Sequence, residues 1–124
     1  MRKNFFVMAL VAVFAMVTTL AVSGNADAAD LKGWKRKVAM TVAKKQVYPR
    51  SALRREIEGA AKVKVTVDHS GKIASFEVLQ PTGHDVLDRE IPRLMERIDP
   101  LPKPPADASD DQLTFIIPLA WVLQ

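Results

Sequence analysis

Residues 61–80 read AKVKVTVDHSGKIASFEVLQ and carry the clearest structural signal in the chain. Apolar side chains at positions 61, 63, 65 and 67 alternate with polar ones, which is the period of a β-strand with one wet face. The next residues, 69–72, predict a turn, and Ile73–Gln80 predicts a returning strand. Phe76 follows Ile73 by three positions, so the alternation is interrupted and we expect a bulge or a late strand start there.

Two helices are expected before this hairpin. Apolar residues at 31, 34, 38 and 42 recur at helical spacing and predict an amphipathic helix over residues 31–45. Lysine and arginine residues lie between them. We expect the helix to pack on the domain with a wet basic side, and the alternative is contact of that basic side with anionic lipid. Pro49 ends this helix and fits the first turn of a second, short helix that extends to Ile57.

The second half of the chain predicts one more helix and a closing strand. Thr82 or Asp85 could cap the helix, and Pro92 inside it predicts a kink. The proline-rich segment 99–105 must be extended, and residues 113–123 favour a final strand. Pro118 cannot donate to a ladder, which indicates an open edge on at least one side. The apolar stripe of the helix consists of Leu87, Ile91, Leu94, Met95 and Ile98. The order helix, helix, strand, strand, helix, strand predicts an α+β fold in which helices cover one face of an antiparallel sheet.

The chain has 124 residues, which is room for one domain, and its first residues resemble an export signal. Arg2 and Lys3 precede an uncharged apolar run, Phe5–Val22, and the sequence Ala-Asp-Ala at 26–28 fits a cleavage site. We expect cleavage after Ala28. The alternative is an uncleaved inner-membrane anchor, because 18 apolar residues are about the minimum that spans a bilayer. Either reading places the domain outside the cytoplasm, in the periplasm.

Composition and motifs do not favour catalysis or nucleic-acid binding. The 18 basic and 14 acidic residues give a net charge of +4 and alternate along the chain. The sequence therefore lacks the concentrated basic stripe that is typical of nucleic-acid-binding proteins. The chain has no cysteine, which excludes disulfides and thiolate chemistry. His69 and His84 stand in turns and could meet at one end of the sheet to hold a metal, but polar turn residues are the favoured reading. We therefore expect no enzyme activity, no metal and no cofactor.

Residues 48–123 resemble the C-terminal domain of TonB-family energy transducers. The matching features are a Tyr48-Pro49 opening, the corner at 57–59, the strand at 62–67, the turn at 68–73 and the ending at 113–119. Residues 82–88, TGHDVLD, are similar to the family's helix entry of small residue, Gly, His, two variable positions, Leu and Asp. The family positions matched here are Tyr48, Pro49, Gly59, Gly71, Gly83 and Leu87.

The resemblance implies a small three-stranded antiparallel sheet with two helices on one face, preceded here by the extra amphipathic helix. Together with the leader and the helix read above, it divides the chain into residues 1–28 (signal peptide or uncleaved anchor), 29–47 (helix) and 48–124 (TonB C-terminal-like domain). It also implies a partner, the periplasmic TonB box of outer-membrane receptors for siderophores or vitamins, which adds as a strand beside the last strand. The docking edge would then consist of Gln112, Leu113, Thr114, Phe115, Ile116 and Ile117.

Two departures from the family keep a second hypothesis open. Phe5–Val22 contains neither the serine nor the histidine with which family anchors engage the proton-driven motor, so an inner-membrane motor partner is doubtful. About 25 residues separate Val22 from Tyr48, far fewer than the family's proline-rich spacer. The first hypothesis is a periplasmic module that binds receptor peptides by strand addition. The second is an envelope interaction domain without energy transduction, TolA-like or forming a homodimer through the same edge.

Overall fold

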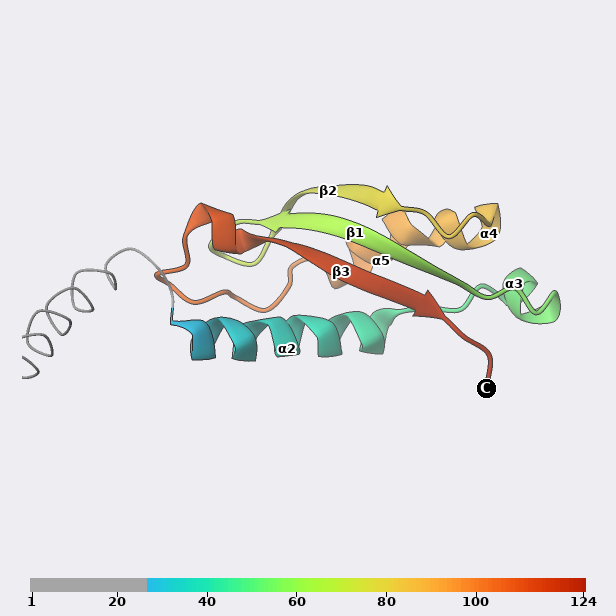
Figure 1. The fold of residues 1–124 in the computed structure, drawn as a ribbon, viewed down its shortest axis with the longest axis horizontal. Coiled ribbons are helices and arrows are strands. Elements are labelled where there is room, and N and C mark those ends of the chain that lie inside the picture. Colours follow the sequence, from blue (N-terminus) through green and yellow to red (C-terminus); the bar gives the residue numbers. More distant parts are fainter. Residues whose placement is uncertain (1–26) are drawn as a thin grey trace, which may run out of the picture.

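The computed structural model describes residues 27–124. Its three strands form one antiparallel sheet in the order β2-β1-β3, with helices packed on one face (Figure 1). The predicted α+β fold is therefore confirmed. The expected signal or anchor falls on residues outside the described range, except for its last two, Asp27 and Ala28. The elements are α2 (Ala28–Lys45), α3 (Arg50–Arg54), β1 (Gly59–Val67), β2 (Ile73–Gln80), α4 (Asp85–Asp88), α5 (Glu90–Ile98), the 3-10 helix η1 (Asp110–Leu113) and β3 (Thr114–Trp121).

The central strand β1 follows the alternation that the sequence predicts. Its apolar residues, among them Val63 and Val65, are fully buried against the helices, and Lys62 and Lys64 lie on the exposed face. The pairing of β1 with β2 shifts register twice, once near Ile73 as expected and once between Val78 and Gln80. The pairing of β1 with β3 is regular throughout. These two ladders leave β2 and β3 as the edges of the sheet.

Helix α2 packs on the sheet and belongs to the domain. Trp34, Val38 and Val42 are buried, and the Trp34 ring meets the Phe115 ring edge to face at 5.1 Å. The Trp34 indole Nε1 also donates to the Pro102 carbonyl oxygen at 2.7 Å, so the extended segment after α5 is tied to the same helix. In Figure 1, α2 runs alongside β3, while α5 lies behind the sheet.

Helices α2 and α5 are joined at their ends. The Arg97 Nε donates to the Lys45 carbonyl oxygen at 3.2 Å, and the Lys45 Nζ donates to the Arg97 carbonyl oxygen at 3.1 Å. The Arg97 guanidinium also pairs with Glu90, which is the one buried charged side chain in the described residues. The buried carboxylate is therefore compensated by a cation, as a buried charge requires.

The predicted kinked helix is two helices. The helical hydrogen-bond pattern is interrupted at Arg89, although this residue keeps right-handed helical backbone angles (φ −67°, ψ −23°). Pro92, which has no N–H to donate, stands in the first turn of α5. The expected caps are also corrected, because His84 is the N-cap of α4 rather than Thr82 or Asp85. The apolar stripe behaves as predicted, since all five of its side chains are buried.

The bounds of α3 and of β3 also differ from the predicted ones. Pro49 is the N-cap of α3, not a residue of its first turn, and α3 ends at Arg54 instead of Ile57. It ends early because Glu56 takes a left-handed φ of 54° and the Ile57 N–H donates back to Ala52. The last strand starts at Thr114 and ends at Trp121, one residue later and two earlier than expected. None of the helices between residues 27 and 124 is long and apolar enough to cross a membrane.

Candidate functional site: the outer edge of β3

Within residues 27–124 the outer edges of β2 and β3 are both unpaired, and the edge of β3 is the one that borders a groove. Residues of an antiparallel strand turn their N–H and C=O groups alternately to one neighbour and to the other. Pro118 has no N–H and lies opposite Lys62, and the Ala120 carbonyl oxygen accepts from the side chain of α2 residue Gln46, not from β1. Thr114, Ile116, Pro118 and Ala120 therefore turn their main chain away from β1.

A side-chain contact agrees with this assignment. The hydroxyls of Thr66 and Thr114, which lie opposite each other, are 3.1 Å apart. Such closeness is typical of pairs that exchange no main-chain hydrogen bonds with each other. Phe115 and Ile117, by contrast, face β1 with their main chain and the helices with their side chains.

The edge is open over only part of its length. At its far end, the Gln46 Nε2 donates to the Ala120 carbonyl oxygen at 2.7 Å and occupies that acceptor. Pro118 offers a carbonyl but no donor. Full donor-and-acceptor pairs are therefore available at Thr114 and Ile116, followed by the Pro118 carbonyl. A partner strand would pair with residues 114–118, a length of about 17 Å at 3.4 Å per residue.

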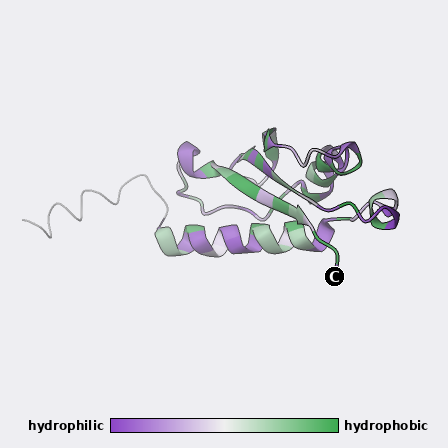
Figure 2. Ribbon diagram, turned by 45° about the vertical axis from the view of Figure 1, so that its right-hand side comes forward, coloured by the Kyte–Doolittle hydropathy of each residue, from purple (hydrophilic) through white to green (hydrophobic). Residues whose placement is uncertain are grey.

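An open groove of about 770 Å³ borders this part of the edge. One wall is the side of α2, the floor is β3, and Lys64 and Leu79 extend the lining onto the outer face of the sheet. Figure 2 shows β3 as largely hydrophobic beside a helix that carries several hydrophilic residues. The groove residues are Lys35, Val38, Ala39, Val42, Ala43, Gln46, Lys64, Leu79, Thr114, Phe115, Ile116, Ile117 and Pro118.

The charges of the groove are all positive. Lys35 stands on the helical wall and Lys64 on the sheet, and no acidic residue is part of the lining. Both lysines are exposed residues. Because the remaining lining is apolar or neutral, the groove suits an extended chain with apolar side chains and at least one negative charge.

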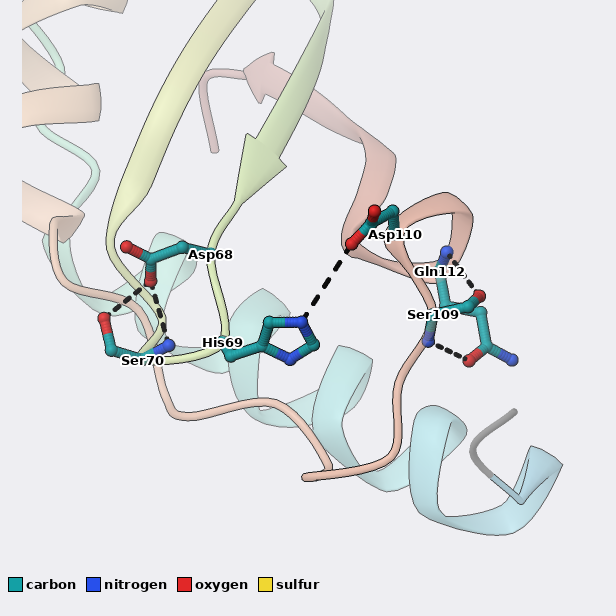
Figure 3. A network of polar contacts seen from close by, with 6 residues as sticks. All are labelled: Asp68, His69, Ser70, Ser109, Asp110 and Gln112. Atoms are coloured by element: carbon teal, nitrogen blue, oxygen red, sulfur yellow. Dashed lines mark hydrogen bonds and ion pairs between the residues drawn. The ribbon is translucent and has the colours of Figure 1, made fainter. Parts of the chain in front are cut away.

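Two of the predicted edge residues lie outside the strand. Gln112 and Leu113 belong to η1, and Leu113 is buried in the core. Ser109 and Gln112 form a capping box (Figure 3), in which the Gln112 Oε1 accepts from the Ser109 N–H at 2.9 Å and the Ser109 Oγ accepts from the Gln112 N–H at 3.4 Å. The other four, residues 114–117, are in β3 as expected, but only Thr114 and Ile116 turn their main chain outward.

The turn between β1 and β2 lies beside η1 (Figure 3). The Asp68 Oδ1 accepts from the Ser70 Oγ at 2.6 Å, the Ser70 N–H at 2.9 Å and the Lys72 N–H at 3.0 Å. The hydrogen bonds from Ser70 hold the pKa of Asp68 below its ordinary value. His69 reaches toward Asp110 at 4.0 Å, and both side chains are exposed. Because both side chains are exposed to solvent, this contact contributes little to stability.

The two histidines do not meet. His69 lies before β2 and His84 after it, so the length of an eight-residue strand separates them. Within residues 27–124 no group of three His, Asp or Glu side chains lies close enough to hold a metal ion. The metal site considered from the sequence is therefore not formed by these two side chains.

The residues that match the family positions have roles in the fold itself. The Tyr48 hydroxyl donates to the Ile57 carbonyl oxygen, and partial burial, aided by the charge of Glu58, raises the pKa of its phenol. Gly59 passes so close to α4 that an added Cβ would lie 3.0 Å from Leu87. Gly71 and Gly83 have positive φ angles of 94° and 85°. These residues shape the corners of the fold and lie apart from the groove.

The sequence did not indicate the contribution of α2 to the groove. Gln46 reaches Ala120 across 74 residues, and no local pattern marks it. Lys35 and Ala39 lie on the helical wall because each directly follows a buried residue of α2 in the sequence. A helical wheel could have suggested this once the location of the groove was known.

Comparison with known proteins gives a consistent result. The model of the Gram-negative bacterial TonB protein C-terminal family matches residues 44–123. Protein TonB of Pseudomonas putida is 30% identical over 104 residues, which are 83% of this chain and 42% of that protein. The NMR structure of the Helicobacter pylori TonB C-terminal domain aligns with a TM-score of 0.59 and 23% identity, covering 74% of this chain and 82% of that chain. A shorter version of that domain gives 0.52 and 25%, covering 71% and 91%.

The fold and the open edge thus define a TonB-type C-terminal domain. Because the family model matches more than half of the chain, this chain belongs to the TonB C-terminal family. Domains of this type are interaction domains of energy transducers. The chain spans less than half the length of the Pseudomonas putida relative.

Proposed function

We propose that this chain is an exported binding module that captures an extended segment of an outer-membrane receptor by strand addition. The observation that carries the proposal is the unpaired edge of β3 at residues 114–118, with an apolar groove along it. A peptide added there would receive main-chain hydrogen bonds, each contributing about 0.5–1.5 kcal/mol. Its alternate side chains would enter the groove beside α2 or lie over Ile116 and Lys64. The proposed partner is the periplasmic TonB box of outer-membrane receptors for scarce nutrients.

Amide hydrogen exchange of the full chain in mild detergent tests this docking mode. The probe is a synthetic peptide with the TonB box of a receptor from the same organism. Without peptide, the Thr114 and Ile116 amides should exchange quickly, and the Phe115 and Ile117 amides, bonded to β1, should exchange slowly. Saturating peptide should slow Thr114 and Ile116 alone. The alternating amides of one strand are thus the control for each other.

Other outcomes of the same experiment separate the alternatives. A peptide that binds without slowing Thr114 and Ile116 would contradict strand addition at β3. If these two amides slow with rising protein concentration in the absence of peptide, the edge instead pairs with a second copy. That result would favour the homodimeric envelope domain over the receptor-binding module.

The cellular form depends on whether residues 1–28 are a cleaved export signal. We propose cleavage after Ala28, which would give a soluble periplasmic protein that begins at Ala29. Cell fractionation with intact-mass measurement tests this. A full-length species in the inner membrane would contradict cleavage and would justify a search for motor partners.

A further inference from the structure

Helix α2 carries a second row of residues that the domain does not use. Trp34, Val38 and Val42 form the packed row, with a spacing of four residues. Positions two residues away are turned by 200°, to the opposite side of a helix. The row on that side consists of Lys32, Arg36, Met40 and Lys44, all exposed.

This outer row consists of three basic side chains and one apolar side chain, that of Met40. The Met40 side chain is 66% exposed, which is the highest value among the large hydrophobic side chains described. Lys37 lies next to Arg36 on the flank of the row. The only acidic residue in α2 is Asp30 in its first turn. Within residues 27–124, the ion pairs are His69 with Asp110 and Arg97 with Glu90, so the basic residues of the outer row have no acidic partner.

We propose that the outer row of α2 binds the surface of a bilayer that contains anionic phospholipid. Clustered ammonium and guanidinium groups match phosphate headgroups, and an exposed methionine between them can enter the boundary between headgroups and acyl chains. In the uncleaved form the sequence adds support for this partner, because the uncharged apolar run Phe5–Val22 ends six residues before α2 starts. Six residues reach at most about 22 Å. Whenever that run occupies a membrane, α2 lies close to the same surface.

Lipid binding at the outer row leaves the groove free. The groove uses Lys35, Ala39 and Gln46, which lie on the flank of α2 toward β3. The outer row points away from the sheet. The domain can therefore contact lipid and a peptide at the same time, and the two proposals fail or hold separately.

Site-specific fluorescence on the full chain in vesicles tests the proposal. The chain has no cysteine, so Met40→Cys gives one attachment site for an environment-sensitive dye. Ser75→Cys, on the exposed strand β2, gives the matched reference site. Emission is compared between phosphatidylcholine vesicles and vesicles that also contain phosphatidylglycerol. We expect a blue shift at position 40 in the anionic vesicles only, reversed by high salt, and no shift at position 75.

Charge variants make the test specific. Each basic residue near an anionic surface contributes roughly a fivefold factor, so Lys32→Gln, Arg36→Gln and Lys44→Gln together should weaken the docked state roughly 100-fold and abolish the shift. The triple control Arg50→Gln, Arg54→Gln and Arg55→Gln removes the same charge from the exposed α3 region and should keep it.

Three results would overturn the lipid assignment. The first is equal emission in both kinds of vesicle. The second is equal loss of the shift in the α3 control. The third is binding of poly-glutamate at position 40 without any response to vesicles, which would assign the outer row to an acidic protein. Circular dichroism of each variant verifies that the fold is kept.

Discussion

Proline substitution at two neighbouring positions of β3 should affect different properties: at Ile116 peptide binding, and at Ile117 the stability of the fold. Ile116 is 54% exposed and turns its main chain away from β1, whereas Ile117 is 5% exposed and turns its main chain toward β1. Ile116→Pro therefore removes a donor from the docking edge but no hydrogen bond of the sheet. Ile117→Pro breaks the ladder with β1 and removes a core side chain.

The structure allows both magnitudes to be worked out. Ile116→Pro should change the free energy of unfolding by about 1 kcal/mol or less, because the side chain is largely solvated. In the complex it leaves a peptide carbonyl unpaired and places a ring against the added strand, at a cost of about 2 kcal/mol or more, which is roughly a 30-fold weaker Kd. Ile117→Pro loses a buried isoleucine, about 2–5 kcal/mol, in addition to its ladder bond. That is a large part of the stability of a small domain.

Calorimetric titration with the TonB-box peptide and urea unfolding of each variant measure these two effects. Ile116→Pro should fold normally and bind poorly, and Ile117→Pro should unfold at much lower urea. Unchanged peptide affinity in Ile116→Pro would refute strand addition at this edge. If Ile116→Pro unfolds and Ile117→Pro is tolerated, the assignment of which main-chain groups face outward is inverted.

Four further substitutions test the fold. Gly71→Ala should destabilise the domain by several kcal/mol, because the added Cβ would lie 2.2 Å from the Leu101 carbonyl oxygen, while Gly83→Ala, with a similar φ and open space, should cost about 1 kcal/mol; thermal unfolding compares them. Gly33→Ala should raise the free energy of unfolding by about 0.5–1 kcal/mol in urea melts, since the position is helical and open. Asp68→Asn should flatten the acid limb of the stability curve, because the lowered pKa of Asp68 stabilises the fold above about pH 5 and this contribution is lost as the pH falls through that pKa.

The sequence predicts those parts of the fold that depend on local periodicity. The alternation in β1 predicted its buried face, and the irregular step after Ile73 predicted one of the two register shifts. The stripe of the last helix predicted the buried side of α5. Its break at Arg89 was missed, since a proline inside a stripe fits a kinked helix as well as the first turn of a new one.

The site was predicted only in part, because it depends on contacts between distant residues. Pro118 indicated an open edge, but which main-chain groups face outward follows from the pairing of β3 with β1. The reach of Gln46 to Ala120 and of Trp34 to Pro102 spans 74 and 68 residues, and no local pattern indicates either. Leu113 was assigned to the strand because apolar and β-favouring residues follow it directly, and the resemblance placed Gln112 on the docking edge, whereas Ser109 caps a short helix there.

The packing of α2 decides how this chain can work within the family. A helix free of the domain would extend the reach from Val22 by about 27 Å, at 1.5 Å for each of its 18 residues. In the structure, Trp34, Val38 and Arg97 bind α2 to the domain, so it forms one wall of the groove and cannot serve as a spacer. Residues 23–27 alone remain between Val22 and the packed helix, and they reach at most about 18 Å. Force transmission across the periplasm needs a longer connection, so even an uncleaved form would be a module that binds its peptide close to the membrane that holds it.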